Sequence, residues 1–145
     1  MAKTDFRIRE MTEDDIEKVK YMHCYDPSLE ELWLSNFHGY FSGEDSLCLI
    51  AQYGEEIAEY VLSTSDAPAG CIQYILVTDK YKRNCIGYNL FDTAINILRT
   101  RGVKNVSVSI HTQNNAALNL SRKFGFQLRE IDLNSHKRYI GSLEL

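Results

Sequence analysis

One stretch in the second half of the chain combines cations and main-chain groups that suit a phosphate. An apolar run, 72–77, leads into a turn that contains Lys80, Lys82 and Arg83, and Gly87 then opens an amphipathic helix. The first N–H groups of a helix have no partner within the helix, and the positive end of its dipole lies at the same place. A strand feeding such a turn is therefore typical of a site that binds phosphate groups.

The spacing of apolar residues predicts the elements that position this turn. Thr12 is expected to cap the first helix, and Gly102 and Gly125 are expected to end the last two. We expect seven strands, at 6–9, 46–53, 57–64, 71–78, 106–110, 126–131 and 138–145, and four helices, at 13–24, 29–37, 86–101 and 114–123. Antiparallel strands followed by βαβ connections form a mixed sheet with helices on both faces, so the predicted fold class is α/β (α+β).

Composition indicates one globular domain over residues 1–145. The apolar content of 44% and charged content of 25% are ordinary for such a domain. No apolar run reaches the roughly 20 residues that span a bilayer, and the N-terminus turns charged at once, so we expect neither membrane insertion nor secretion. The four cysteines form no Cys-x-x-Cys pair, which argues against a metal site and a disulfide framework and favours the cytoplasm.

Charge is distributed unevenly along the chain. Residues 21–66 contain nine Asp or Glu and no Lys or Arg, whereas residues 80–104 contain six basic residues and one acid. Such a chain suits a polyanionic ligand in one half and a cationic ligand in the other. The net charge of −4 and the scarcity of aromatic residues among the cations disfavour nucleic acid as a partner.

Two motifs in this element order resemble those of the GNAT superfamily of acetyl-CoA-dependent N-acetyltransferases. That family has a strand ending in Val, then Tyr, a basic residue or Gln, two residues, Gly, one residue and Gly. The corresponding residues here are Val77 and then Tyr81-Lys82-Arg83-Asn84-Cys85-Ile86-Gly87. The family's second motif is Asn, two residues, Ala and an aliphatic helix ending in Lys-x-Gly-Phe, which here begins at Asn114 and ends at Lys123-Phe124-Gly125-Phe126.

The resemblance implies a sheet that splays between the fourth and fifth strands and holds acetyl-CoA there. Main-chain groups of Ile75, Leu76 and Val77 would pair with the pantetheine arm, and a bulge would free an N–H for the thioester carbonyl, the catalytic role assigned to Leu76. Asn114 would contact the pantetheine from the other side. The pyrophosphate would bind the turn and first helical residues, namely Lys82, Arg83, Asn84, Cys85, Ile86, Gly87 and Tyr88.

Three positions depart from the family pattern. Cys85 replaces the first loop glycine, and it is either an inert small residue or a thiol activated at a helix N-terminus. Ser121 stands where many members have the Tyr that protonates the departing thiolate; a water, Tyr88 or Tyr139 could substitute. Ser109 stands where many members carry the base, which leaves His111, two residues on, as the candidate general base.

The expected reaction is transfer of an acetyl group from acetyl-CoA to a primary amine by direct attack in a ternary complex. The acid-rich, aromatic first half suits a cationic acceptor, either a small amine or a peptide N-terminus. The alternative is an acyl-CoA-binding regulatory module with weak or no catalysis. The sequence is compatible with a monomer or a homodimer, and in a homodimer strand 138–145 could pair across the interface as an edge strand.

Overall fold

The computed structural model describes residues 6–19, 46–77, 86–133 and 136–145. These residues form one mixed sheet of seven strands in the order β1-β2-β3-β4-β5-β7-β6. The elements in chain order are β1 Phe6–Glu10, α1 Glu13–Val19, β2 Ser46–Tyr53, β3 Glu56–Asp66, β4 Ala69–Val77, α3 Ile86–Thr100, β5 Asn105–His111, α4 Asn115–Lys123, β6 Gln127–Leu133 and β7 His136–Glu144. The predicted fold class and the seven predicted strands are confirmed.

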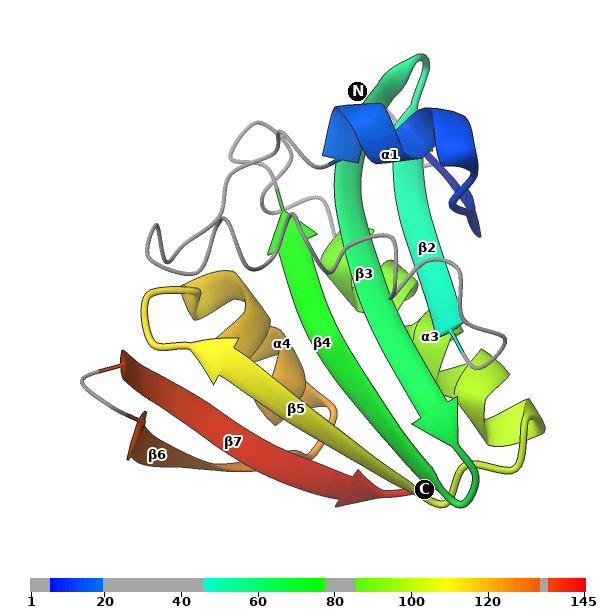
Figure 1. Cartoon of the computed structure of the whole chain (residues 1–145). Coiled ribbons are helices and arrows are strands. Elements are labelled where there is room, and N and C mark those ends of the chain that lie inside the picture. Colours follow the sequence, from blue (N-terminus) through cyan, green and yellow to red (C-terminus); the bar gives the residue numbers. More distant parts are fainter. Residues whose placement is uncertain (1–5, 20–45, 78–85, 134–135) are drawn as a thin grey trace.

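Helices lie on both faces of the sheet, with α1 on one face and α3 and α4 on the other (Figure 1). Three of the four predicted helices fall on described residues. The predicted helix at 29–37 and the predicted end of the first helix at residue 24 lie outside them. The two later helices agree with the prediction to within a residue or two because their apolar spacing is regular.

The larger core lies between the sheet and the pair α3 and α4. Leu90, Phe91, Ala94 and Leu98 are buried along one side of α3 and join sheet residues such as Val61 in one cluster. A smaller cluster lies under α1 and includes Ile16, Val19, Ile50, Tyr60 and Leu62. Since Val61 belongs to one cluster and its neighbours to the other, β3 is buried on both faces, as expected for a central strand.

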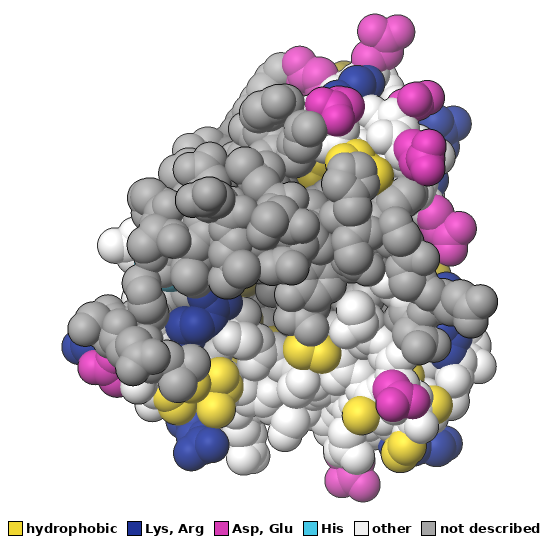
Figure 2. All heavy atoms as spheres, viewed as in Figure 1, with side chains coloured by type: hydrophobic (Ala, Val, Ile, Leu, Met, Phe, Trp, Pro, Cys, Tyr) yellow, Lys and Arg dark blue, Asp and Glu magenta, His cyan; other side chains and the backbone are white. Residues whose placement is uncertain are grey.

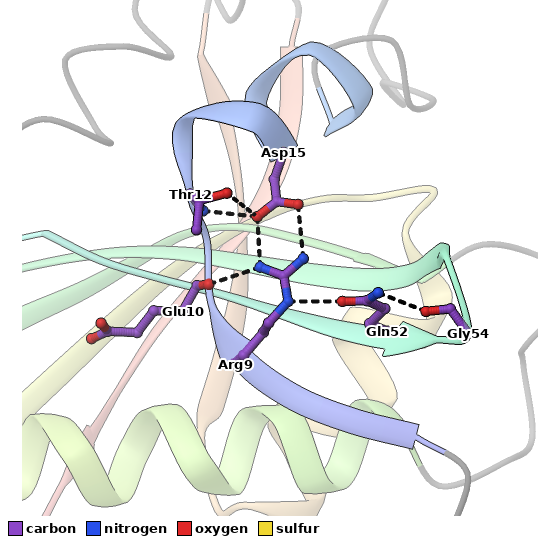
Figure 3. A network of polar contacts seen from close by, with 6 residues as sticks. All are labelled: Arg9, Glu10, Thr12, Asp15, Gln52 and Gly54. Atoms are coloured by element: carbon purple, nitrogen blue, oxygen red, sulfur yellow. Dashed lines mark hydrogen bonds and ion pairs between the residues drawn. The ribbon is translucent and has the colours of Figure 1, made fainter.

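A polar network fixes the start of α1 to the first two strands (Figure 3). The guanidinium of Arg9 donates to both carboxylate oxygens of Asp15, at 2.7 and 2.9 Å, and to Oε1 of Gln52 at 2.7 Å. Asp15 also accepts the main-chain N–H of Thr12 at 2.8 Å, as in a capping box. The hydrogen bond from Arg9 lowers the pKa of Asp15 to about 2. The predicted helix start at Thr12 therefore has a charged anchor that the sequence pattern did not indicate.

Both glycines that were predicted to end a helix do so. Gly102 follows α3 with φ +90° and Gly125 follows α4 with φ +98°, a region that side chains rarely adopt. Their N–H groups donate back to the carbonyls of Arg99 and Arg122 at 3.1 and 3.0 Å, which ends each helix.

The last strand is not at the edge of the sheet. β7 pairs with β5 on one side and with β6 on the other, so the outer strands of the sheet are β1 and β6. The expectation that 138–145 offers a free edge to a second copy is therefore wrong. The chain returns between two earlier strands, a step that hydrophobic alternation alone does not specify.

Candidate functional site

The sheet opens between β4 and β5. These parallel strands pair only where Ala69–Ile72 lies beside Asn105–Val108. Beyond that point β4 continues to Val77 and β5 to His111, and the two strands diverge (Figure 1). The splay predicted between the fourth and fifth strands is thus present, and it leaves 75–77 beside the opening.

A bulge interrupts β4 just before the opening. Leu62 of β3 lies opposite Tyr74 and Ser63 lies opposite Ile72, so Gln73 has no counterpart in the register. Bulges bend a strand and increase its twist. The bulge therefore contributes to the divergence of β4 from β5, and it lies three residues before Leu76.

The main-chain groups of β4 alternate between β3 and the opening. The carbonyl of Ile75 accepts a hydrogen bond from Asn114, at the start of α4 on the other side of the opening. The main-chain groups of Ile75 therefore point away from β3. Because successive strand residues direct their N–H and C=O groups to opposite sides, Val77 shares the direction of Ile75. Leu76, which lies opposite Tyr60, directs its groups toward β3.

Asn114 bridges the opening at the start of α4. Its Nδ2 donates to the Ile75 carbonyl at 3.1 Å and its Oδ1 accepts the N–H of Ala117 at 3.2 Å. The residue is only 8% exposed, so these hydrogen bonds hold it in one orientation. An Asn side chain has two amide hydrogens and two lone pairs, which leaves one donor and one acceptor for a ligand.

The first turn of α3 supplies the described part of the predicted phosphate site. It contains Ile86, Gly87 and Tyr88 and no acidic residue, so its N–H groups and dipole favour an anion. The ring of Tyr88 is stacked on Phe124, with centroids 4.8 Å apart. The remaining predicted phosphate ligands, Lys82, Arg83, Asn84 and Cys85, lie outside the described residues.

The three candidate general acids, Ser121, Tyr139 and Tyr88, differ in their surroundings. Ser121 of α4 is fully buried, and its hydroxyl has no hydrogen-bond partner among the described residues. Tyr139 of β7 is half-buried, and the guanidinium carbon of Arg122 lies 5.7 Å from its ring centroid. Tyr88 is 47% exposed. A hydroxyl without a partner is free to turn toward a bound ligand.

The candidate base, His111, lies at the end of β5 on the same face as Ser109. Its Nδ1 accepts the main-chain N–H of Gln113 at 3.1 Å. A ring nitrogen that accepts a hydrogen bond carries no proton, so the neutral ring holds its proton on Nε2. Ser109 is bound by Arg138, whose Nε donates to the Ser109 hydroxyl at 2.7 Å.

One group at this site was not singled out by the sequence analysis. Glu59 of β3 is completely buried, and neither carboxylate oxygen has a hydrogen-bond partner among the described residues. Burial raises the pKa of Glu59 to about 8. A single acid within the apolar run of strand 57–64 is the signal that could have found it.

A hollow of about 700 Å³ lies on the sheet face formed by β5, β6 and β7. Its polar lining is supplied by Ser107, Ser109, Gln127, Arg129 and Ser142, and none of its lining residues is acidic. On the same side of the molecule, Asp and Glu side chains gather around α1 (Figure 2). The hydroxyls and the amide both donate and accept hydrogen bonds, whereas the Arg129 guanidinium is charged and only donates, so the hollow by itself suits an electron-rich rather than a cationic group.

The described residues lack two further features. No helix there is both long and apolar enough to cross a membrane. No group of three or more His, Cys, Asp or Glu side chains in that part of the chain is placed to hold a metal ion.

Comparisons with known proteins agree with this geometry. The fold is similar to the PaiA N-acetyltransferase of Thermoplasma acidophilum in complex with coenzyme A, at 19% identity and a TM-score of 0.77 over 100% of both chains. It is also similar to the ribosomal-protein-S18-alanine N-acetyltransferase of Escherichia coli, at 20% identity and a TM-score of 0.76 over 96% of this chain and 93% of that one.

A third similar structure is Ard1 of Thermoplasma volcanium, at 18% identity and a TM-score of 0.74 over 97% of this chain and 98% of that one. No match was found among curated protein sequences. The sequence profile described as the Acetyltransferase (GNAT) family matches residues 9–126, which include β4, α3, β5 and α4. The chain therefore belongs to the GNAT acetyltransferase family, and its enzyme class is that of an acetyltransferase.

Proposed function

We propose that this protein transfers an acetyl group from acetyl-CoA to a primary amine, by direct attack of the amine on the thioester. The observation that carries the proposal is the opening between β4 and β5, where β4 extends to Val77 beyond its last pair with β5 at Ile72. An exposed strand edge binds an extended chain through main-chain hydrogen bonds. The pantetheine arm, which carries two amides, is such a chain.

The residues around the opening fit the parts of acetyl-CoA. The main-chain groups of Ile75 and Val77 would bind the pantetheine, with the remaining donor and acceptor of Asn114 opposite them. The first turn of α3 would bind the pyrophosphate together with residues 82–85. We place the thioester carbonyl on an N–H of Ile75 or Val77 rather than on Leu76, because alternation directs the groups of Leu76 toward β3.

Positioning would supply most of the rate. A thioester is already reactive toward amines, so holding the two reactants in line and stabilising the developing oxyanion with a main-chain N–H are the largest contributions. The amine nitrogen forms a bond to the carbonyl carbon, the carbon–sulfur bond breaks, and sulfur leaves with the electron pair. The ammonium proton is lost to a base or to water.

His111 and Ser121 are proposed to move the protons. His111 can accept the proton of the amine at Nδ1 once the contact with the N–H of Gln113 opens, or through a water. Ser121 has a hydroxyl without a partner among the described residues and can donate a hydrogen bond to the departing thiolate. A serine hydroxyl is a weak acid, so its contribution is expected to be small.

The acceptor is proposed to be a cationic amine, either a small molecule or a peptide N-terminus. The acidic side chains around α1 (Figure 2) would attract such a group. The donor-rich hollow at β5, β6 and β7 suits a carbonyl or carboxylate elsewhere on the same acceptor, as a peptide has. One protein of similar fold is the ribosomal-protein-S18-alanine N-acetyltransferase of Escherichia coli. Peptides that begin with a small residue are therefore the first acceptors to test.

The test is titration calorimetry of acetyl-CoA followed by a thiol-release assay on the same sample with pooled amines and N-terminal peptides. Binding with release of CoA supports the proposed transferase. Absence of binding would contradict it.

A second function, an acyl-CoA-binding module with little catalysis, is favoured by one observation. Ser121 is fully buried at the position where a general acid would be needed, and its hydroxyl has no hydrogen-bond partner among the described residues that would orient it for proton transfer. Tight binding of acetyl-CoA without CoA release, across polyamines, aminoglycosides and peptides, would support this alternative.

A further inference from the structure

A buried carboxyl lies directly against the first turn of α3. Glu59 is on the central strand β3, between Ala51 of β2 and Val77 of β4 in the register. A Cβ atom at Gly87 would lie 3.0 Å from Oε1 of Glu59 and 3.5 Å from Oε2. The glycine therefore leaves the space that the carboxyl occupies, and the carboxyl faces the helix end proposed to bind phosphate.

Among the described residues, none is found that compensates a charge on Glu59. Ala51 on β2 and Ile86 on α3 are buried apolar residues of one cluster. A Cβ atom at Gly87 would also lie 3.5 Å from a methyl carbon of Leu120 on α4. The first turn of α3 has no acidic residue. Neither carboxylate oxygen has a hydrogen-bond partner among the described residues. Burial alone accounts for the raised pKa, about 8, so the carboxyl is mostly protonated at neutral pH.

Protonation decides what the helix end can bind. The N-terminus of a helix carries a partial positive charge that attracts an anion. A neutral Glu59 leaves this charge to an incoming phosphate, whereas an ionised Glu59 takes up the same positive field and repels the phosphate from behind the first turn. Because the carboxyl is shielded from water, that repulsion is weakly screened.

We propose that Glu59 is a positioning residue that couples acetyl-CoA binding to a proton: the neutral carboxyl permits the pyrophosphate to bind at the first turn of α3, and its ionisation weakens that binding. The proposal rests on the proposed function for the site, and it adds a regulation by pH. Coupling is reciprocal. Bound acetyl-CoA therefore raises the affinity of Glu59 for its proton, and the protein takes up a proton when it binds the cofactor near pH 8.

The experiment is titration calorimetry of acetyl-CoA between pH 7 and pH 9.5, a range above the pKa of the cofactor's own phosphates. At pH 8 the titration is repeated in two buffers of different ionisation enthalpy, which gives the number of protons taken up. The variant is Glu59→Gln, which cannot ionise. The matched control is Glu56→Gln, which removes an exposed acid from the same strand.

We expect the dissociation constant of the wild type to rise by at least about fivefold over this range, the lower end of ordinary coupling, with uptake of a fraction of a proton at pH 8. Glu59→Gln should keep the pH 7 affinity at every pH, and Glu56→Gln should behave as the wild type. Proton uptake is measured on the wild type alone, so it decides the proposal even where Glu59→Gln does not fold.

Two results would overturn the proposal while leaving the transferase intact: binding whose affinity does not change with pH and takes up no proton, or a pH dependence that survives in Glu59→Gln. Failure of the wild type to bind acetyl-CoA at pH 7 would instead overturn the proposed function, and this proposal with it.

Discussion

At the scale of single residues, two buried carboxyl groups respond to pH in opposite directions. Asp15 is paired with a guanidinium and a main-chain N–H, so its charged form is stabilised. Glu59 has neither kind of partner in the described part of the chain, and burial favours its neutral form. The carboxylate of Asp15 thus anchors the start of α1, whereas the carboxyl of Glu59 keeps its proton at neutral pH.

The pKa of Glu59 predicts a loss of stability as pH rises from about 4.5 to about 8. The folded pKa of about 8 lies above the ordinary value of 4.5. The contribution of the protonated carboxyl to stability is therefore fully present below pH 4.5 and is lost as pH rises through 8. Between these values the group lowers the free energy of unfolding by about 1.4 kcal/mol per pH unit. Urea denaturation of the wild type and Glu59→Gln at pH 6 and pH 8 should show the wild type losing stability relative to the variant. An unchanged difference between the two proteins would contradict the raised pKa.

The pKa of Asp15 predicts the opposite dependence. Its folded pKa of about 2 lies below the ordinary 3.8, so its contribution is present above pH 3.8 and is lost as pH falls through 2. Asp15→Asn should lower the free energy of unfolding by about 2 kcal/mol at pH 7, and by much less at pH 2. Asp14→Asn, an exposed neighbour in the same turn, is the control for denaturation at both pH values. A loss of the same size at both pH values would indicate packing rather than charge.

At the scale of elements, the site depends on two parallel strands that are paired at one end and diverge at the other. β4 and β5 share four register pairs and then diverge, and the bulge at Gln73 bends β4 at that point. Asn114 spans the gap from the start of α4 to the carbonyl of Ile75. The opening is therefore held at a fixed width by one side chain as well as by the sheet.

Asn114→Ala should weaken both the fold and the site. The change leaves the buried carbonyl of Ile75 and the N–H of Ala117 without their described partners, at a cost of about 1–2 kcal/mol in the free energy of unfolding. We also expect weaker binding of acetyl-CoA by calorimetry. Asn119→Ala, at an exposed position of the same helix, should change neither quantity measurably. Asn114→Ala with wild-type stability and affinity would show that the bridge is dispensable.

At the scale of the whole molecule, the sequence predicted what depends on local pattern. The ends of β2, α3 and α4 follow from apolar periodicity and from Gly102 and Gly125, which need positive φ. The splay followed from the resemblance to a family, not from periodicity. The turn before α3 and the motif that begins at Asn114 both lie within residues 9–126, which the family profile matches.

Features set by distant contacts could not be predicted from the sequence. β7 lies inside the sheet because it pairs with β5 as well as with β6, and no local signal specifies that order. Glu59 is a single acid in an apolar run, but its place against Gly87 of α3 is set by the packing of a helix that lies far along the chain. The ion pair between Arg9 and Asp15 likewise depends on where α1 settles on β1 and β2.

The most direct test of the central claim, that acetyl-CoA lies in the opening between β4 and β5, is amide hydrogen exchange followed by NMR with and without acetyl-CoA. If acetyl-CoA binds there, the amides of Ile75 and Val77 become protected from exchange. The amide of Leu76, directed toward β3, should exchange slowly in both states and serves as an internal control. Unchanged exchange at Ile75 and Val77 under saturating acetyl-CoA would contradict the account.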